Sequence, residues 1–272
     1  MKPFNSLNLA VVGHIEWVTF LSVNKLPSEG LISHGSNLLE EPAGGGAVAG
    51  VQMANLTKEK VHFFTSLGND NIGKICAQRL EELGLIMHIA WRNQPTRRAI
   101  SLIDSSGERA ITVIGERLQP KGQDKLPWEI LNEFDGVFIT AADGMAINLA
   151  RQAQILCATP RVKIENLNSA NIELDALIGS GLDPDEQIKE EEKKFKTKIK
   201  ISTEGALGGK VEPGGRYKAL KLNKKIVDTY GCGDSFAAGV TVGLAGGLDI
   251  SKAIEIGAKC GAECTARFGP YN

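Results

Sequence analysis

Short apolar, β-branched runs alternate with helix-like segments along most of this 272-residue chain, and the alternation limits the folds open to it. Two parallel strands need a long crossover connection, so strands interleaved with helices indicate βαβ units. The sequence therefore predicts an α/β fold, a doubly wound and mostly parallel sheet with helices on both faces. Strand-like runs cover 7–13, 60–68, 136–142 and 196–203, and helix-like segments cover 46–56, 71–84, 145–157, 233–247 and 251–268.

Two stretches depart from this rhythm. Residues 15–40 and 98–114 alternate apolar and polar side chains, which predicts antiparallel hairpins that form one small sheet apart from the main one. A run of charges at 183–198 predicts a solvated helix face. We expect residues 1–272 to form a single domain that carries the small sheet.

Charge and composition exclude several classes of protein. The chain has 31 Lys and Arg against 32 Asp and Glu, a net charge of -1. It therefore lacks the excess of positive charge that is typical of proteins that bind nucleic acid or an anionic membrane. No apolar run approaches the length of about 18 residues that a membrane helix needs, and the N-terminus lacks the order of a signal peptide. Five cysteines without a CxxC pair or a zinc set favour buried thiols of a cytoplasmic protein.

The 31 glycines cluster, which marks places where the backbone turns tightly or approaches a ligand. Residues 68–75 nearly form a phosphate-binding P-loop, but Ile75 stands where a Ser or Thr would hold Mg²⁺. Residues 44–49 loosely fit a dinucleotide-binding fingerprint, but no buried strand precedes them. Neither segment is predicted to be such a site.

The strongest motif is D-T-Y-G-C-G-D-S-F at residues 228–236, which leads directly into an apolar helix. Gly231 and Gly233 let backbone N–H groups converge at the helix N-terminus, where the helix dipole favours an anion. Asp234, in the first turn, is placed to take a proton from an incoming hydroxyl. The alternative is an ordinary helix start in which glycine makes the turn and aspartate caps it.

This motif resembles the C-terminal signature of the ribokinase-like (PfkB) carbohydrate kinases, D-T-x-G-[AC]-G-D-x-[FY], and matches it completely. The agreement extends along the chain in the family's order, through the hairpin at 98–109. On this resemblance the near-P-loop is a structural turn, and the small sheet is a lid that excludes water. The matching pieces are G13-H-I-E16, L26-P27-x-x-G30, G44-G45, G68-x-D70-x-x-G73 and T203-x-G205-x-x-G208.

The resemblance implies roles for the reacting groups. Asp234 would be the general base, and ATP with Mg²⁺ would supply the phosphoryl group. The N–H groups that face the transferring γ-phosphoryl would come from Gly231, Cys232 and Gly233. The nucleotide site would be lined by Thr203, Gly205 and Gly208. Asp183 would stand in for the carboxylate of the family's Mg²⁺ network, and K⁺ would be held by Asp228, the Tyr230 carbonyl, Cys264 and Gly269.

The substrate side departs from the family's pattern. The aspartate that grips sugar hydroxyls falls on Val18, so Glu16, two residues earlier on the same strand face, is predicted to supply the carboxylate. Gly44 and Gly45 would line the same pocket. A further candidate to meet the substrate is Asp143, with a loop cap as its alternative role. Arg97 and Arg98, which lead the second hairpin, could reach an anionic group of the substrate, and the alternative is a solvated hairpin end.

Together these residues predict a phosphotransferase with an alcohol group as acceptor. It would move the γ-phosphoryl group of ATP to a hydroxyl of a small sugar, polyol or nucleoside, without nucleic-acid or membrane partners. We expect a homodimer formed through the lid. The alternative is a catalytically weak relative that binds a ligand for regulation.

Overall fold

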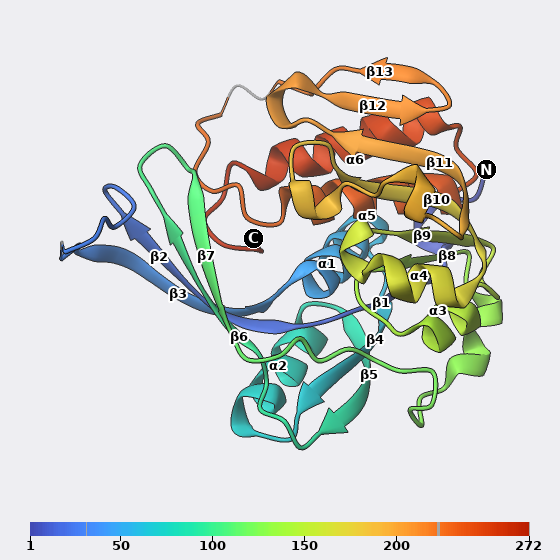
Figure 1. Ribbon diagram of the computed structural model, residues 1–272, viewed down its shortest axis with the longest axis horizontal. Helices are drawn as coiled ribbons and strands as arrows, with labels where there is room; N and C mark the ends of the chain where they lie inside the picture. The colour runs from blue at the N-terminus through green and yellow to red at the C-terminus, as the bar shows by residue number, and fades with distance from the viewer. Residues whose placement is uncertain (31, 222–223, 272) are drawn as a thin grey trace.

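A nine-stranded sheet runs through the centre of the computed structural model, which describes residues 1–30, 32–221 and 224–271 (Figure 1). Its strands are β1 (Leu9–Val12), β4 (Val61–Gly68), β5 (Leu85–Arg92), β8 (Gly136–Ile139), β9 (Ile155–Ala158), β10 (Glu173–Ser180), β11 (Lys196–Thr203), β12 (Gly209–Glu212) and β13 (Gly215–Tyr217). They lie in the order β13-β12-β11-β10-β9-β8-β1-β4-β5. All neighbours from β11 to β5 are parallel, and β12 and β13 add an antiparallel edge.

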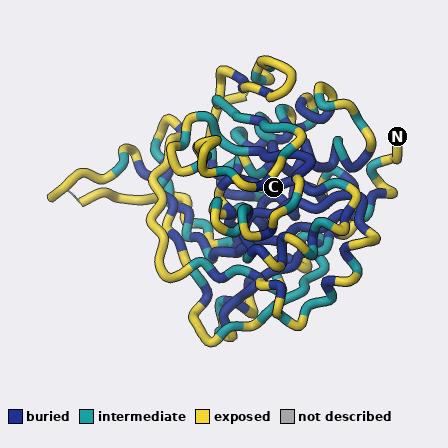
Figure 2. The backbone as a smooth tube through the Cα atoms, turned by 45° about the vertical axis from the view of Figure 1, so that its right-hand side comes forward, coloured by how far each residue is buried: buried dark blue, intermediate teal, exposed yellow. Residues whose placement is uncertain are grey.

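Helices cover both faces of this sheet, which confirms the predicted α/β architecture. Successive residues of β1 divide between two apolar clusters, with Leu9 and Val11 on one face and Ala10 and Val12 on the other. Figure 2 shows the resulting buried centre. The first face packs against α1 (Gly45–Thr57), α2 (Asn71–Glu82), α5 (Cys232–Ala245) and α6 (Ile250–Cys264), and the second against α3 (Gly144–Ala150) and α4 (Ile164–Ala170).

Helix α5 lies between α6 and the sheet, which explains why its sequence is apolar on nearly every side. A Cβ atom added to Gly239 would lie 2.8 Å from the Cα of Gly257 on α6. The two helix backbones therefore approach closely only because both residues are glycine. This packing fixes the N-terminus of α5 over the end of the sheet.

A second, four-stranded sheet extends from the body of the molecule at the left of Figure 1. It is built from β2 (Glu16–Val23), β3 (Gly35–Ala43), β6 (Arg98–Ile103) and β7 (Arg109–Ile114), in the order β3-β2-β6-β7. The two predicted antiparallel hairpins are confirmed, and they join through a parallel pairing of β2 with β6. Its inner face packs Phe20 edge-on against Tyr230, 4.8 Å between ring centroids. We call this sheet the lid.

The turn that resembles a P-loop is a capped helix start. Asp70 Oδ1 accepts from the backbone N–H of Gly73 at 2.7 Å, and Asp70 Oδ2 accepts from the N–H of Thr96 at 2.7 Å. Burial opposes the ionised form, but these hydrogen bonds outweigh it and lower the pKa of Asp70. The carboxylate thus ties the start of α2 to the segment that enters the lid.

Three predicted elements are wrong. The helix predicted over 145–157 ends at Ala150, and Ile155–Ala158 is the central strand β9, because this apolar run is buried between β8 and β10. The charged run at 183–198 forms two single-turn helices, Pro184–Glu186 and Glu190–Glu192, since it offers no apolar stripe to pack. The closing helix ends at Cys264 rather than at 268.

Within the described residues, no helix combines the length and apolar character needed to cross a membrane.

Candidate active site

The predicted reactive residues gather where the parallel strands end. Strand β1 ends at Val12, just before His14 and Glu16, and the N-termini of α1 and α5 meet at the same edge. In open α/β sheets ligands bind outside the carboxyl ends of the strands, where loops and helix N-termini converge. The site is therefore placed by the topology of the main sheet and covered by the base of the lid.

Asp234 lies in the first turn of α5, directly against the start of α1. A Cβ atom added to Gly45 would lie 2.7 Å from Asp234 Oδ1, so the carboxylate occupies the space that a side chain at Gly45 would need. Burial and the nearby negative charge of Glu186 raise the pKa of Asp234 from its ordinary 3.8 to about 6, against the opposing effect of Arg161. A carboxyl group with this pKa is ionised at neutral pH yet basic enough to accept a proton.

The α5 N-terminus has the geometry of an anion site. Gly231 precedes the helix with a φ of +72°, a conformation that side-chain-bearing residues rarely adopt. A Cβ atom at Gly231 would also lie 2.9 Å from Val48, whereas one at Gly233 would meet nothing within 4 Å. The backbone conformation at residue 231 thus requires glycine. At residue 233 the absence of a side chain leaves the N-terminus of α5 open to solvent.

Glu16 faces the same site from the start of β2 and is 7% exposed. Its Oε1 lies 3.1 Å from Nε of Arg97 and 3.6 Å from Nε2 of His14. Gly44 has a φ of +87° and packs against the side chains of His14 and Glu16. A Cβ atom added to Gly44 would lie 3.3 Å from His14 and 3.4 Å from Glu16. Burial raises the pKa of Glu16, while the positive charge of Arg97 opposes that shift.

Tyr230 links the glycine turn to the signature motif. Its hydroxyl accepts a hydrogen bond from the backbone N–H of Gly44 at 3.0 Å, and the ring is buried beneath the lid. Burial raises the pKa of Tyr230, so the hydroxyl stays neutral. This contact holds the start of α1 in register with the start of α5.

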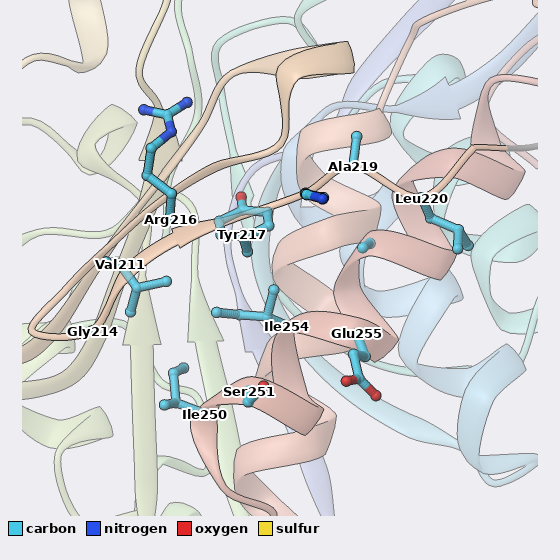
Figure 3. A pocket seen from close by; sticks show the side chains of 13 residues that line it. Val211, Gly214, Arg216, Tyr217, Ala219, Leu220, Ile250, Ser251, Ile254 and Glu255 are labelled. Carbon is cyan, nitrogen blue, oxygen red and sulfur yellow. The ribbon is translucent and has the colours of Figure 1, made fainter.

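A cavity of about 460 Å³ lies between the β12–β13 hairpin and α6 (Figure 3). Thr203 ends β11 and pairs with Gly209 across the sheet, and the turn through Gly205 and Gly208 leads into the hairpin. A Cβ atom at Gly208 would lie 2.1 Å from the carbonyl oxygen of Tyr217. The cavity is lined mainly by apolar side chains, among them Val211, Tyr217, Ala219, Leu220, Ile250 and Ile254.

The four residues predicted to hold K⁺ lie together, and their oxygen atoms accept hydrogen bonds from within the set. The buried Asp228 accepts N–H bonds from Tyr230 at 2.8 Å and from Gly269 at 3.1 Å. The Tyr230 carbonyl accepts the Cys264 thiol at 3.1 Å. Within the described residues no group of three or more His, Cys, Asp or Glu side chains is arranged to hold a metal ion. These hydrogen bonds link the C-terminal loop to the signature motif, and K⁺ binding by the same residues stays a prediction.

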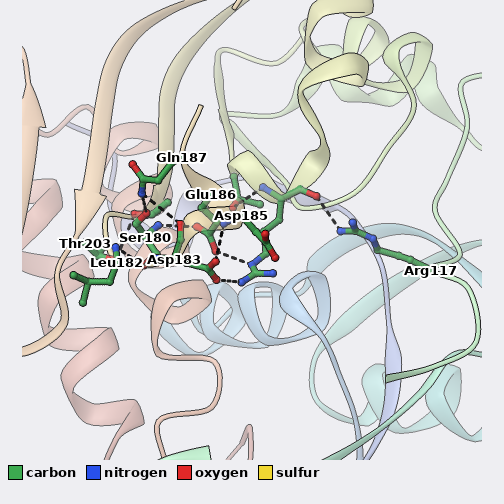
Figure 4. A network of polar contacts seen from close by, with 11 residues as sticks. Arg117, Ser180, Leu182, Asp183, Asp185, Glu186, Gln187 and Thr203 are labelled. Carbon is green, nitrogen blue, oxygen red and sulfur yellow. Dashed lines mark hydrogen bonds and ion pairs between the residues drawn. The ribbon is translucent and has the colours of Figure 1, made fainter. Parts of the chain in front are cut away.

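The end of β10 carries an acidic and basic network (Figure 4). Arg161 pairs with Asp183, and its Nε donates to Glu186 Oε1 at 2.6 Å. Glu186 Oε2 also accepts from the backbone N–H of Ser180 at 2.6 Å. Asp183 caps a single helical turn, and Glu186 is the carboxylate whose charge acts on Asp234.

Of the other two predicted substrate residues, Asp143 has a structural role and Arg98 is exposed. Asp143 caps α3, because its Oδ1 accepts from the N–H groups of Ala146 at 2.8 Å and Gly122 at 2.9 Å. Arg98 begins β6 and is exposed, while the preceding Arg97 contacts Glu16.

Sequence reasoning missed Arg117, Arg161 and Glu186. Arg161 follows β9, the strand that the sequence pattern assigned to a helix, so its place at the end of a parallel strand was hidden. Arg117 follows the second lid hairpin, where a cation looks like part of a solvated loop. Glu186 lies three residues beyond the aligned Asp183, in a run of many charges.

Solved structures share this fold. Thermotoga maritima ribokinase matches with a TM-score of 0.75 and 21% identity, over 97% of this chain and 94% of that one. An Arabidopsis thaliana ribokinase complexed with ribose and ATP matches with a TM-score of 0.73 and 20% identity, over 99% and 94% of the two chains. The fold is ribokinase-like: a large, mostly parallel sheet with a separate small one.

A family model for the pfkB family carbohydrate kinases matches residues 6–168 and 167–272. The chain therefore belongs to the pfkB family of carbohydrate kinases, enzymes that transfer a phosphoryl group to an alcohol group. An ATP-dependent ribose-1-phosphate kinase of Halopiger xanaduensis is 26% identical over 94% of this chain and 91% of that protein. A ribokinase of Lactococcus lactis is 23% identical over 96% and 91% of the two proteins.

Proposed function

We propose that this protein transfers the γ-phosphoryl group of ATP to a hydroxyl of a small sugar, polyol or nucleoside, with Asp234 as the general base. The observation that carries the proposal is the position of Asp234, a carboxylate with a raised pKa at the open N-terminus of α5 and against Gly45. Asp234 thus borders the proposed anion site and the Gly44–Gly45 turn, which Glu16 contacts from its other side. A base must lie between the acceptor and the transferred group, and this geometry provides that position.

Phosphoryl transfer depends mainly on the positioning of the two substrates and on stabilisation of the charge on the transferred group, and it needs no covalent intermediate with the protein. Asp234 would hold the acceptor hydroxyl and remove its proton as the oxygen attacks phosphorus. The backbone N–H groups of Gly231, Cys232 and Gly233 would face the negative charge that builds on the phosphoryl oxygens, helped by the dipole of α5. The lid would exclude water, so that ATP is not hydrolysed.

ATP would bind in the cavity beside α6. Its apolar lining suits a flat aromatic base, and the turn through Gly205 and Gly208 leads from that lining to Thr203 at the end of β11. When bound with ATP, Mg²⁺ neutralises charge on the phosphates. Asp183 and Glu186 would offer the hard carboxylate oxygens that such an ion prefers, and binding it would displace their present ion pairs with Arg161. No step of the proposal uses K⁺.

A sugar is the favoured acceptor among the three classes, because the relatives named above are ribose and ribose-phosphate kinases. Glu16 would hydrogen-bond the acceptor hydroxyls. It would take the role of the family's aspartate, whose position is occupied here by Val18. The rival role, a ligand-binding regulatory protein, would leave the altered pocket without turnover. The intact reactive motif favours the enzyme.

The lid is also the proposed contact between two copies of the chain. The face of the lid turned away from the site exposes Ile100 and Ile114. Covering such side chains would stabilise a dimer. Light scattering should report twice the monomer mass, and Ile100→Glu should lower that mass. A monomeric wild-type protein would refute this part of the proposal.

The test of the function is a screen for ATP consumption by the purified protein across sugars, sugar phosphates, polyols and nucleosides. We expect one chemical group of these acceptors to raise ADP release far above the rate without acceptor, with a phosphorylated product visible by ³¹P NMR. Tight ligand binding without turnover for every acceptor would support the regulatory role instead.

A further inference from the structure

Three arginines converge around Glu16. Arg97 contacts its carboxylate at 3.1 Å, and Nη1 of Arg117 donates to the backbone carbonyl of Arg161 at 3.0 Å (Figure 4). The charges of all three act on Glu16 and on the neighbouring His14. Arg161 also lies close enough to Asp234 for their charges to interact. The cluster therefore shares one site with the proposed base.

The three residues come from three separate segments of the chain. Arg97 directly follows Thr96, the residue that Asp70 anchors, and leads into strand β6 of the lid. Arg117 lies just after β7, where the chain leaves the lid. Arg161 lies in the single turn Pro160–Val162 after β9. Both connections of the lid thus contribute a guanidinium to the site.

The three arginines differ in their partners. Arg97 has Glu16 as its partner, and Arg161 has Asp183 and Glu186. Among the residues that the structure describes, Arg117 forms no ion pair with a carboxylate, and its partner is a neutral carbonyl group. Burial and repulsion by Arg97 lower the pKa of Arg117. An unpaired, half-buried cation is costly, and a bound anion would remove that cost.

His14 adds a second, independent sign of a missing ligand. The residue is 8% exposed, and Nδ1 of its side chain has no hydrogen-bond partner among the described residues. Burial, with repulsion by Arg117, holds the pKa of His14 well below its ordinary value, so the ring is neutral. A buried polar nitrogen without a partner is rare in folded proteins unless something else binds there.

We infer that the acceptor substrate is itself a phosphate ester, a small sugar phosphate whose phosphate group is held by Arg117 and Arg97 while a hydroxyl is presented to Asp234. The inference rests on the proposed function and narrows its substrate class. Two guanidinium groups suit a dianionic phosphate, because each presents a planar fork of donors. Glu16 is left to hold a hydroxyl of the same molecule.

The reaction leaves the substrate's own phosphate unchanged. The acceptor oxygen loses its proton to Asp234 and forms a bond to the γ-phosphorus of ATP. The bond between that phosphorus and the bridging oxygen breaks, and ADP leaves with the bond's electron pair. The product is a bisphosphate.

The first test compares matched acceptors in steady-state kinetics: ribose with ribose 1-phosphate and ribose 5-phosphate, and fructose with fructose 6-phosphate. We expect one phosphorylated member to exceed its parent sugar at least 100-fold in kcat/KM. Arg117→Gln should raise the KM for that sugar phosphate by about 10-fold or more, since a hydrogen bond to a charged group contributes about 1.5–3 kcal/mol. The KM for ATP should stay within about two-fold.

The matched control is Lys189→Gln, which removes an exposed cation outside the site and should leave all constants unchanged. Equal kcat/KM for sugars and their phosphates would overturn the inference and leave the proposed function standing. So would an Arg117→Gln variant whose main change is a raised KM for ATP, because the cluster would then serve the nucleotide. Preference for the carboxylates ribonate or gluconate would likewise overturn it.

A binding measurement separates the inference from catalysis. Calorimetric titration of the Asp234→Asn variant with the same sugars and sugar phosphates needs no turnover. Binding of a sugar phosphate that is lost in Asp234→Asn/Arg117→Gln supports the anion site even where the wild-type protein shows no kinase activity. Equal binding with and without Arg117 refutes the site directly.

Discussion

Replacing Asp234 by asparagine is expected to stabilise the folded protein at neutral pH. In the folded protein the pKa of Asp234 is raised from 3.8 to about 6, chiefly by burial and then by the charge of Glu186. The folded state therefore holds this proton more tightly than the unfolded state. As pH rises through the interval between the two values, stability is lost, and the loss is complete above the folded pKa.

The size of the effect follows from the same two values. A difference of roughly two pKa units corresponds to about 3 kcal/mol of destabilisation above pH 6, and about 1 kcal/mol remains at pH 4.5. Asparagine has nearly the same shape and carries no charge. The advantage of Asp234→Asn should therefore grow by about 2 kcal/mol between pH 4.5 and pH 7.5.

Urea unfolding of the wild type and the variant at these two pH values measures this difference without any substrate. Glu190→Gln is the control, because the Glu190 side chain is 69% exposed and its removal should change stability equally little at both pH values. An Asp234→Asn variant that is less stable than wild type at pH 7.5 would refute the reasoning. A stability difference that is the same at both pH values would also refute it.

Three further predictions concern single side chains. Gly231→Ala should destabilise the fold, because of its positive φ and the contact with Val48, whereas Gly233→Ala should be tolerated; equal melting temperatures for the two variants would contradict this. Glu16→Gln should raise the substrate KM about ten-fold or more with the ATP KM nearly unchanged, and equal substrate KM values in steady-state assays would remove Glu16 from the site. Cys232→Ala should keep most of the activity, since its backbone N–H is the proposed donor; loss of turnover in a folded variant would point to thiol chemistry.

Sequence reasoning found the features that are encoded by contiguous motifs or by periodic patterns of residues. The alternation of strands and helices predicted the main sheet, and the nine-residue motif at 228–236 predicted the α5 N-terminus with Asp234 in its first turn. Glu16 follows from the family resemblance, which aligns the substrate aspartate with Val18, together with the alternation of side chains that puts both residues on one strand face. Such signals are local, so no tertiary structure is needed to see them.

The remainder depended on tertiary placement. Arg117 and Arg161 come from separate segments, one after the lid strand β7 and the other after strand β9 of the main sheet, and only the folded chain brings them together beside Glu16. Asp143 has the composition of a site residue, yet its carboxylate is used by the N-terminus of α3. The misassigned segment at 155–158 is a short apolar run, whose periodicity does not distinguish a buried strand from a buried helix.

The central claim is that Asp234 takes the proton from the acceptor hydroxyl during phosphoryl transfer from ATP. The most direct measurement is kcat of Asp234→Asn on the best acceptor from the screen, together with its affinity for ATP. The predicted result is a loss of kcat by about 10² to 10⁴, with ATP affinity within a few fold of wild type. A folded variant that retains more than half of the wild-type kcat would contradict the claim.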